Sequence, residues 1–99
     1  MKIILRQLVK LEGDRFPHSW SKTYESNIKP TVGDKIEDPI WKDPYEYEVK
    51  EVVINYAVGE CYVAIEEYNI TVPENRKDDF VNMAHSHGWK TSWEKKYSI

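Results

Sequence analysis

The sequence contains a single cysteine, only four glycines and no long uninterrupted run of apolar residues. Because a disulfide framework needs paired cysteines, Cys61 has no partner within the chain, and a reducing, cytoplasmic compartment is expected. Each glycine falls at a predicted turn or helix end, so none remains to build a phosphate-binding loop. The apolar runs are too short to cross a bilayer, and no membrane association is expected.

An excess of charge of either sign is also lacking, since 14 basic residues oppose 17 acidic ones and the net charge is −3. This weak acidity opposes nonspecific attraction to polyanions, so nucleic acid is disfavoured as a partner. The charges are unevenly placed, because acids dominate from Asp43 to Glu67 whereas residues 89–99 are basic overall. Such asymmetry can orient a partner or a second copy of the chain, so the sequence permits a homodimer.

Aromatic side chains are the abundant class, with four tryptophans, seven tyrosines and two phenylalanines in 99 residues. Each large ring buries about 150 to 250 Å² on folding. A chain of this length supplies one hydrophobic core, and we expect a single domain over residues 1–99. The balance of apolar and charged residues is that of a globular protein, which excludes disorder.

Alternation of apolar and polar residues predicts most of the strands. It runs from Ile3 to Leu11 and again from Tyr45 to Lys50, the period expected of a strand with one wet face. The apolar phase shifts after Lys50, which predicts a β-bulge near residues 50–52. A hairpin is predicted around Gly59, followed by a strand that carries on one face Cys61, Val63 and Ile65.

The segments between these strands have weaker patterns. Residues 16–20 are predicted to be irregular, and the spacing of Tyr24 and Ile28 favours a short helical turn within residues 21–29. Turn residues from Pro30 to Asp34 lead into a short predicted strand at 35–37. Two prolines, Pro39 and Pro44, then bracket a loop that contains Trp41.

One helix is predicted near the C-terminus. Pro73 suits a first helical turn, and Gly88 supplies the left-handed residue that ends the helix. Helical spacing places on one face Phe80, Met83, Ala84 and His87. A final strand is predicted from the alternation that follows, which consists of Trp89, Thr91 and Trp93.

The stretch from Val32 to Ile36, followed by Tyr47 to Val49 and a hairpin, resembles the opening strands of many small SH3-like barrels. The predicted fold is therefore α+β: a small, strongly curved antiparallel sheet of SH3-like barrel type, with one C-terminal helix followed by a final strand. Barrels of this kind host unrelated functions, so the resemblance implies an architecture and no active residue.

A metal- or thiol-dependent enzyme is one alternative for the function. His85 and His87, with His18 or Asp79, have the side chains of a zinc site, and Cys61 has a nucleophilic thiol. Residues two apart in a helix point about 200° from each other, which opposes a metal site shared by His85 and His87. The same histidines equally fit a helix C-terminus whose dipole they complement. An apolar row around Cys61 favours a core residue. We therefore predict no cofactor.

A nucleic-acid-binding small barrel is the other alternative. Residues 89–97 combine rings with lysines, the mixture that single-strand binders use to stack bases and to contact phosphates. The net acidity of the chain opposes this function, and burial of Trp89 and Trp93 in the core also explains their presence.

The sequence favours a non-catalytic interaction module that binds a protein or peptide partner. No catalytic spacing is present, and the loops carry surplus aromatic residues. The proline-bracketed loop holds Trp41 rigidly, and tryptophan is enriched at interface hot spots. The predicted binding surface therefore centres on Trp41 with Tyr45 and Trp20, while the competing interpretation is that Trp41 plugs one end of the barrel.

Overall fold

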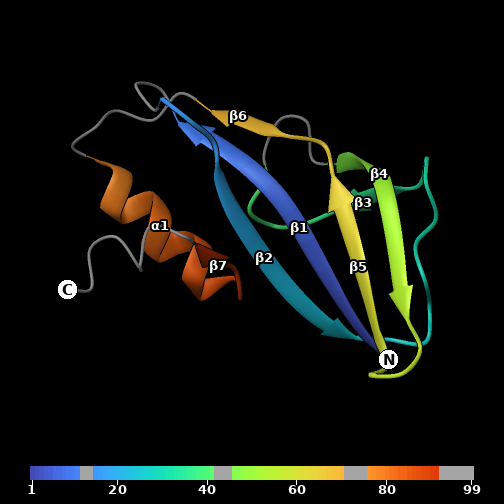
Figure 1. The fold of residues 1–99 in the computed structure, drawn as a ribbon. Coiled ribbons are helices and arrows are strands. Elements are labelled where there is room, and N and C mark those ends of the chain that lie inside the picture. Colours follow the sequence, from blue (N-terminus) through green and yellow to red (C-terminus); the bar gives the residue numbers. More distant parts are fainter. Residues whose placement is uncertain (12–14, 42–45, 71–75, 92–99) are drawn as a thin grey trace.

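The computed structural model describes residues 1–11, 15–41, 46–70 and 76–91. These residues form a small mixed α+β domain, mostly a seven-stranded sheet with one helix (Figure 1). The strands are β1 (Lys2–Leu11), β2 (His18–Glu25), β3 (Lys35–Glu37), β4 (Glu46–Asn55), β5 (Glu60–Ile65), β6 (Tyr68–Ile70) and β7 (Lys90–Thr91). The helix is α1 (Lys77–Ser86). None of the helices in the described ranges is long and apolar enough to cross a membrane.

The sheet is mixed and open. Its order is β3-β4-β5-β1-β2-β7, and β6 pairs with β1 beside that path. Central β1 runs antiparallel to β2 but parallel to both β5 and β6, so the prediction of a wholly antiparallel sheet was wrong. Within the described residues β3 does not pair with β7, and the barrel is not confirmed. Alternation along a strand specifies its buried face, but it specifies neither the neighbour nor the direction of pairing.

Strand β1 is long enough to pair with two strands, one after the other, along the same edge. Its first half pairs with β5 and its last three residues with β6, so the chain between these partners makes an irregular step. The side chain of Gln7 supports this step, because its Nε2 donates to the carbonyl oxygen of Glu66 at 2.9 Å. That hydrogen bond explains how a polar residue is buried in the apolar row of β1.

Several local predictions are confirmed. The inward residues of β1 are buried in strict alternation, β3 has the predicted bounds, and β4 and β5 form the hairpin. The register between β4 and β5 shifts between Val49 and Glu51, where the bulge was predicted. The helical turn predicted within residues 21–29 was wrong, because His18 to Glu25 pair with β1 along eight positions. Long-range pairing there overrides a weak local preference.

Helix α1 packs its apolar side on the sheet as predicted. Phe80 and Ala84 are buried, and the ring centroid of Phe80 lies 5.4 Å from that of Trp20. Gly88 has φ +89°, the left-handed conformation expected of the residue that ends the helix. The chain then turns back onto the last turn of the helix, where the backbone N–H of Trp89 donates to the carbonyl oxygen of Ala84 at 3.0 Å. The predicted helix start at Pro73 and the strand residue Trp93 lie outside the described residues.

The core lies on one face of the sheet, which we call the inner face. Aromatic rings connect its parts, since Trp89 lies 6.4 Å from Trp20 and 6.0 Å from Trp41 between ring centroids. The ring centroid of Trp41 in turn lies 4.9 Å from that of Tyr47 in a T-shaped arrangement. The remaining buried apolar residues are Ile3, Leu5, Val9, Leu11, Ile40, Val49, Cys61, Val63, Ile65, Tyr68, Phe80 and Ala84.

Candidate functional site

The structure buries both tryptophans of the predicted binding surface. Trp41 and Trp20 are each only 1% exposed, so neither ring is presented to a partner. The indole N–H of Trp41 donates to Oε1 of Gln7 at 3.1 Å, which fixes the ring inside the core. The prediction that these two rings are exposed was wrong, because both belong to the hydrophobic core. Tyr45, the third predicted residue, lies outside the described residues.

A buried carboxylate holds the tryptophan loop in place. Oδ2 of Asp38 accepts hydrogen bonds from Nζ of Lys22 at 2.7 Å and from the hydroxyl of Tyr24 at 2.9 Å. Oδ1 accepts from the indole N–H of Trp89 and from the backbone N–H of Ile40, each at 3.1 Å. Asp38 thus ties β2, the loop after β3 and the segment after α1 together.

These hydrogen bonds decide the charge state of the cluster. Burial on its own would raise the pKa of the Asp38 carboxyl, but the bonds from Lys22, the Ile40 backbone, Trp89 and Tyr24 outweigh burial, and this pKa lies below its ordinary value. Burial likewise opposes charge on Lys22, yet its bonds to Asp38 and Tyr24 raise the pKa of the ammonium. Four donors satisfy the carboxylate, so Asp38 has a structural role.

Sequence reasoning missed Asp38, although a local signal existed. An aspartate side chain that accepts from the N–H two residues later makes an Asx-turn, and Asp38 does so with Ile40. The long-range donors Lys22 and Trp89 have no such local signature, because they reach Asp38 only after the sheet and helix have assembled.

The residues of the enzyme alternative do not assemble into a site. Cys61 is fully buried in the inner row of β5, with Ile3 and Ile54 as its neighbours in register. Nε2 of His85 lies 3.4 Å from the hydroxyl of Thr91, and Asp79 lies 3.8 Å from Nε of Arg76. No group of three or more metal-ligating side chains occurs in the described part of the chain.

The nucleic-acid alternative was based on residues 89–97. Trp89 is only 2% exposed, so its ring cannot stack on a base. The rest of that segment, from residue 92 onward, lies outside the described residues, and nucleic-acid binding stays a prediction.

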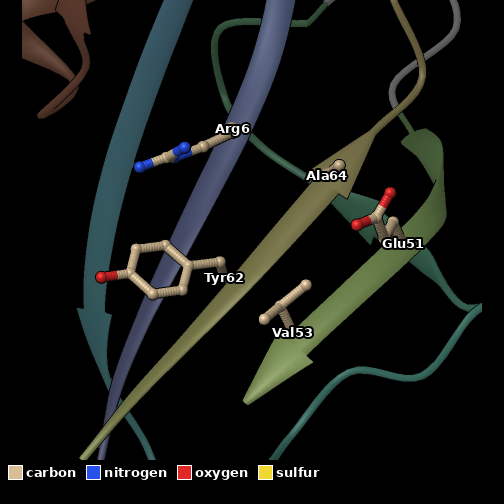
Figure 2. A pocket seen from close by; sticks show the side chains of 5 residues that line it. All are labelled: Arg6, Glu51, Val53, Tyr62 and Ala64. Carbon is tan, nitrogen blue, oxygen red and sulfur yellow. The ribbon is translucent and has the colours of Figure 1, made fainter. Parts of the chain in front are cut away.

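The opposite face of the sheet, which we call the outer face, contains a different kind of site. Figure 2 shows a depression of about 310 Å³ whose lining side chains come from β1, β4 and β5. The lining residues are Arg6, Glu51, Val53, Tyr62 and Ala64. Val53 is 50% exposed, and the nearby outward residue Leu8 is 47% exposed, so apolar surface faces solvent here.

Strand register explains the geometry of this depression. Arg6 pairs with Ala64, and Ala64 pairs with Glu51, so the three residues form one row across β1, β5 and β4. Adjacent strands lie about 4.8 Å apart, which places the α-carbons of Arg6 and Glu51 roughly 10 Å from each other. Ala64 has only a methyl group, so the row is low at its centre and bordered by a cation and an anion (Figure 2).

The next row of the outer face is apolar and aromatic. Ile4 pairs with Tyr62, and Tyr62 pairs with Val53. The guanidinium carbon of Arg6 lies 5.0 Å from the centroid of the Tyr62 ring, a cation–π contact that orients the arginine. The Tyr62 hydroxyl donates to Oε2 of Glu60 at 2.5 Å.

The two charges that flank Ala64 differ from the other paired charges of the sheet. Neither Arg6 nor Glu51 takes part in an ion pair within the ranges that the structure describes. Glu48 on β4 differs, because Nζ of Lys50 lies 2.7 Å and Nζ of Lys35 lies 3.7 Å from its carboxylate. Those lysines lower the pKa of the Glu48 carboxyl.

A second depression, of about 380 Å³, opens at the end of the sheet beside residues 26–36. Its lining is mostly apolar and includes Ile28, which is 80% exposed, together with Tyr24 and Pro30. Among its lining residues Glu25 is the charged one, and its Oε2 already lies 3.5 Å from the N-terminal ammonium. The outer-face depression, which is bordered by the charges of Arg6 and Glu51, is therefore the stronger candidate for specific binding than this apolar one.

Comparison with family models, curated proteins and solved structures found no match for this chain. The function is therefore inferred from the geometry of the described residues.

Proposed function

We propose that the protein is a non-catalytic interaction module that binds a protein partner through the outer face of its sheet. The observation that carries this proposal is the outward row of Arg6, Ala64 and Glu51, in which a cation and an anion that make no ion pair among the described residues border an apolar floor. On the inner face the buried side chains of Gln7 and Asp38 already have hydrogen-bond partners, whereas Arg6 and Glu51 make no ion pair among the described residues.

The composition of this face matches what protein interfaces require. Interfaces place apolar side chains at the centre and polar ones at the rim, with arginine and aromatic residues enriched. The depression has Val53 and Ala64 near its centre, and Arg6 lies over the ring of Tyr62. Binding that removes Val53 and Tyr62 from water would gain hydrophobic free energy in proportion to the apolar area covered.

The chemistry of Cys61 fits a reducing compartment, and we place the protein in the cytoplasm. It is the single cysteine of the chain, and its thiol is fully buried among apolar neighbours. A lone, inaccessible thiol neither forms a bridge nor needs an oxidising environment.

A capture experiment tests the proposed function. Immobilised wild-type protein and the variant Val53→Glu are exposed to the same lysate of the source cells, and the retained proteins are compared by mass spectrometry. Phe16→Glu is the matched control, because Phe16 is 70% exposed and does not line the depression. Both variants add one negative charge in place of an exposed apolar side chain.

We expect at least one protein to be retained by the wild type and by Phe16→Glu and to be lost with Val53→Glu. A partner retained equally by all three proteins would place the binding surface elsewhere. The absence of any retained protein would contradict the proposal outright.

A further inference from the structure

We infer that the outer face binds a second copy of this chain, with the two sheets face to face. This inference rests on the proposed function, because it names the partner of the same surface. A two-fold interface uses one patch twice, so the patch must be complementary to itself. The charges that border Ala64 meet this requirement, since Arg6 and Glu51 have opposite signs and lie on opposite sides of the residue between them.

A two-fold axis that runs along β5 above Ala64 satisfies both charges at once. Rotation about this axis exchanges the β1 side of the patch with the β4 side. Arg6 of each copy is then opposite Glu51 of the other, while Ala64 meets Ala64 at the axis. The small alanine side chains allow the two sheets to approach closely at this point. Two equivalent ion pairs would form, and within one copy neither residue makes an ion pair in the part of the chain that the structure describes.

The same rotation matches the apolar row. Ile4 and Val53 flank Tyr62 in register, so Ile4 of each copy is opposite Val53 of the other. The half-buried side chain of Ile4 and the exposed side chain of Val53 would thus cover one another. Aligned sheets pack about 10 Å apart and rotate by about 30°, so these matches hold for the rows nearest the axis.

The row beyond contains a like-charge contact that limits the affinity. Glu60 lies on β5 between Lys2 and Asn55, so the rotation places Glu60 of one copy near Glu60 of the other. Each of these carboxylates already accepts the hydroxyl of Tyr62. We therefore expect a reversible dimer, strengthened by Glu60→Gln because this change removes the repulsion and keeps a hydrogen-bond acceptor.

Charge exchange between Arg6 and Glu51 tests the inference. Sedimentation velocity is measured on the wild type, R6E, E51R and the double variant R6E/E51R over a concentration series. Each single variant places like charges opposite one another, so we expect its dimer dissociation constant to rise at least about tenfold. The double variant reverses both pairs and should dimerise as the wild type does.

Mixing the two single variants gives the sharpest result. The R6E chain is acidic at both positions and the E51R chain is basic at both, so an equimolar mixture regains opposite charges at both contacts. We expect a heterodimer to form where neither variant dimerises alone. Lys10→Glu is the matched control, because Lys10 is an exposed lysine of β1 outside the central rows. Circular dichroism confirms that every variant is folded.

The outcomes separate this inference from the proposed function. A wild-type chain that stays monomeric at every concentration would overturn the inference, and the capture experiment with Val53→Glu would still decide the proposed function. A dimer that ignores the charge exchanges would also overturn it, because its interface must lie elsewhere. Restoration in the mixture supports both statements.

Discussion

The two faces of the same sheet differ in how their side chains are satisfied. On β1, the inward residues Ile3, Leu5 and Val9 are at most 3% exposed, whereas Arg6 and Leu8 between them face solvent. On the inner face the buried carboxylate of Asp38 accepts hydrogen bonds from four donors. The buried core and this hydrogen-bonded cluster therefore lie on one face, and the other face is the surface that we propose for a partner.

The aromatic residues show the same division. Trp20, Trp41 and Trp89 all lie in the inner layer, where their rings join β2, the loop after β3 and the segment after α1. Tyr62 lies on the outer face, where its ring contacts the guanidinium of Arg6 and its hydroxyl donates to Glu60. The three described tryptophans therefore belong to the hydrophobic core and not to an exposed binding surface.

The largest expected effect is from Trp41→Ala on the inner face. This change removes a buried ring and leaves Oε1 of Gln7 without its donor, so we expect the free energy of unfolding to fall by about 5 kcal/mol. Urea unfolding followed by circular dichroism measures the loss. Trp41→Phe keeps a ring against Tyr47 and should lose about 2 kcal/mol; equal stability of Trp41→Ala and the wild type would contradict the assignment of Trp41 to the core.

Asp38→Ala is expected to be the next most destabilising change. It leaves the ammonium of Lys22 beside a vacant site and removes the acceptor of the Trp89 indole. The Lys22 side chain is 12% exposed and keeps some contact with water, so we expect a loss of about 3 kcal/mol, the lower end for a broken buried pair. Tyr24→Phe removes one donor and should cost about 1 kcal/mol. A fully stable Asp38→Ala would show that the cluster holds nothing together.

The pH dependence of stability should report the same carboxylate. The pKa of Asp38 is lowered on folding, so its contribution is present above the unfolded pKa of about 3.9 and is lost as the pH falls through the folded value. The difference in unfolding free energy between the wild type and Asp38→Ala should therefore shrink below about pH 4. Urea titrations at pH 7 and at successively lower pH measure it. A constant difference would contradict the lowered pKa.

Outer-face substitutions should have the smallest effect on stability. Glu51→Gln removes a charge that makes no ion pair in the described ranges, and we expect the free energy of unfolding to change by less than about 0.5 kcal/mol. Glu48→Gln is an informative comparison on the same strand, because Lys50 and Lys35 contact Glu48. A loss above about 2 kcal/mol for Glu51→Gln would mean that the outer face stabilises the fold.

Local patterns predicted the parts of the fold that depend on neighbouring residues. The sequence predicted three such features: the alternation in β1, the bulge after Val49 and the left-handed conformation of Gly88. Each follows from backbone geometry over a few positions. The parallel pairing of β1 with β5 could not be predicted, since the paired residues, such as Lys2 and Glu60, lie 58 positions apart and alternation does not encode direction.

The candidate site was missed for a related reason. Arg6, Ala64 and Glu51 are unremarkable outward residues in the sequence, and only the register of three strands brings them into one row. Trp41 was predicted to be an exposed binding residue because its loop is bracketed by prolines. Its indole N–H instead donates to Gln7, which lies 34 residues away in the sequence. Burial of that kind depends on tertiary contacts that no local pattern reports.

Two measurements on Val53→Glu together test most directly whether one face stabilises the fold and the other binds. These are its free energy of unfolding and its retention of the partner in the capture experiment. Val53 is half exposed on the outer face, so we expect a stability loss of less than about 1 kcal/mol together with complete loss of the retained partner. A variant that unfolds, or one that is stable and still retains the partner, would contradict the claim that the inner face holds the fold while the outer face binds.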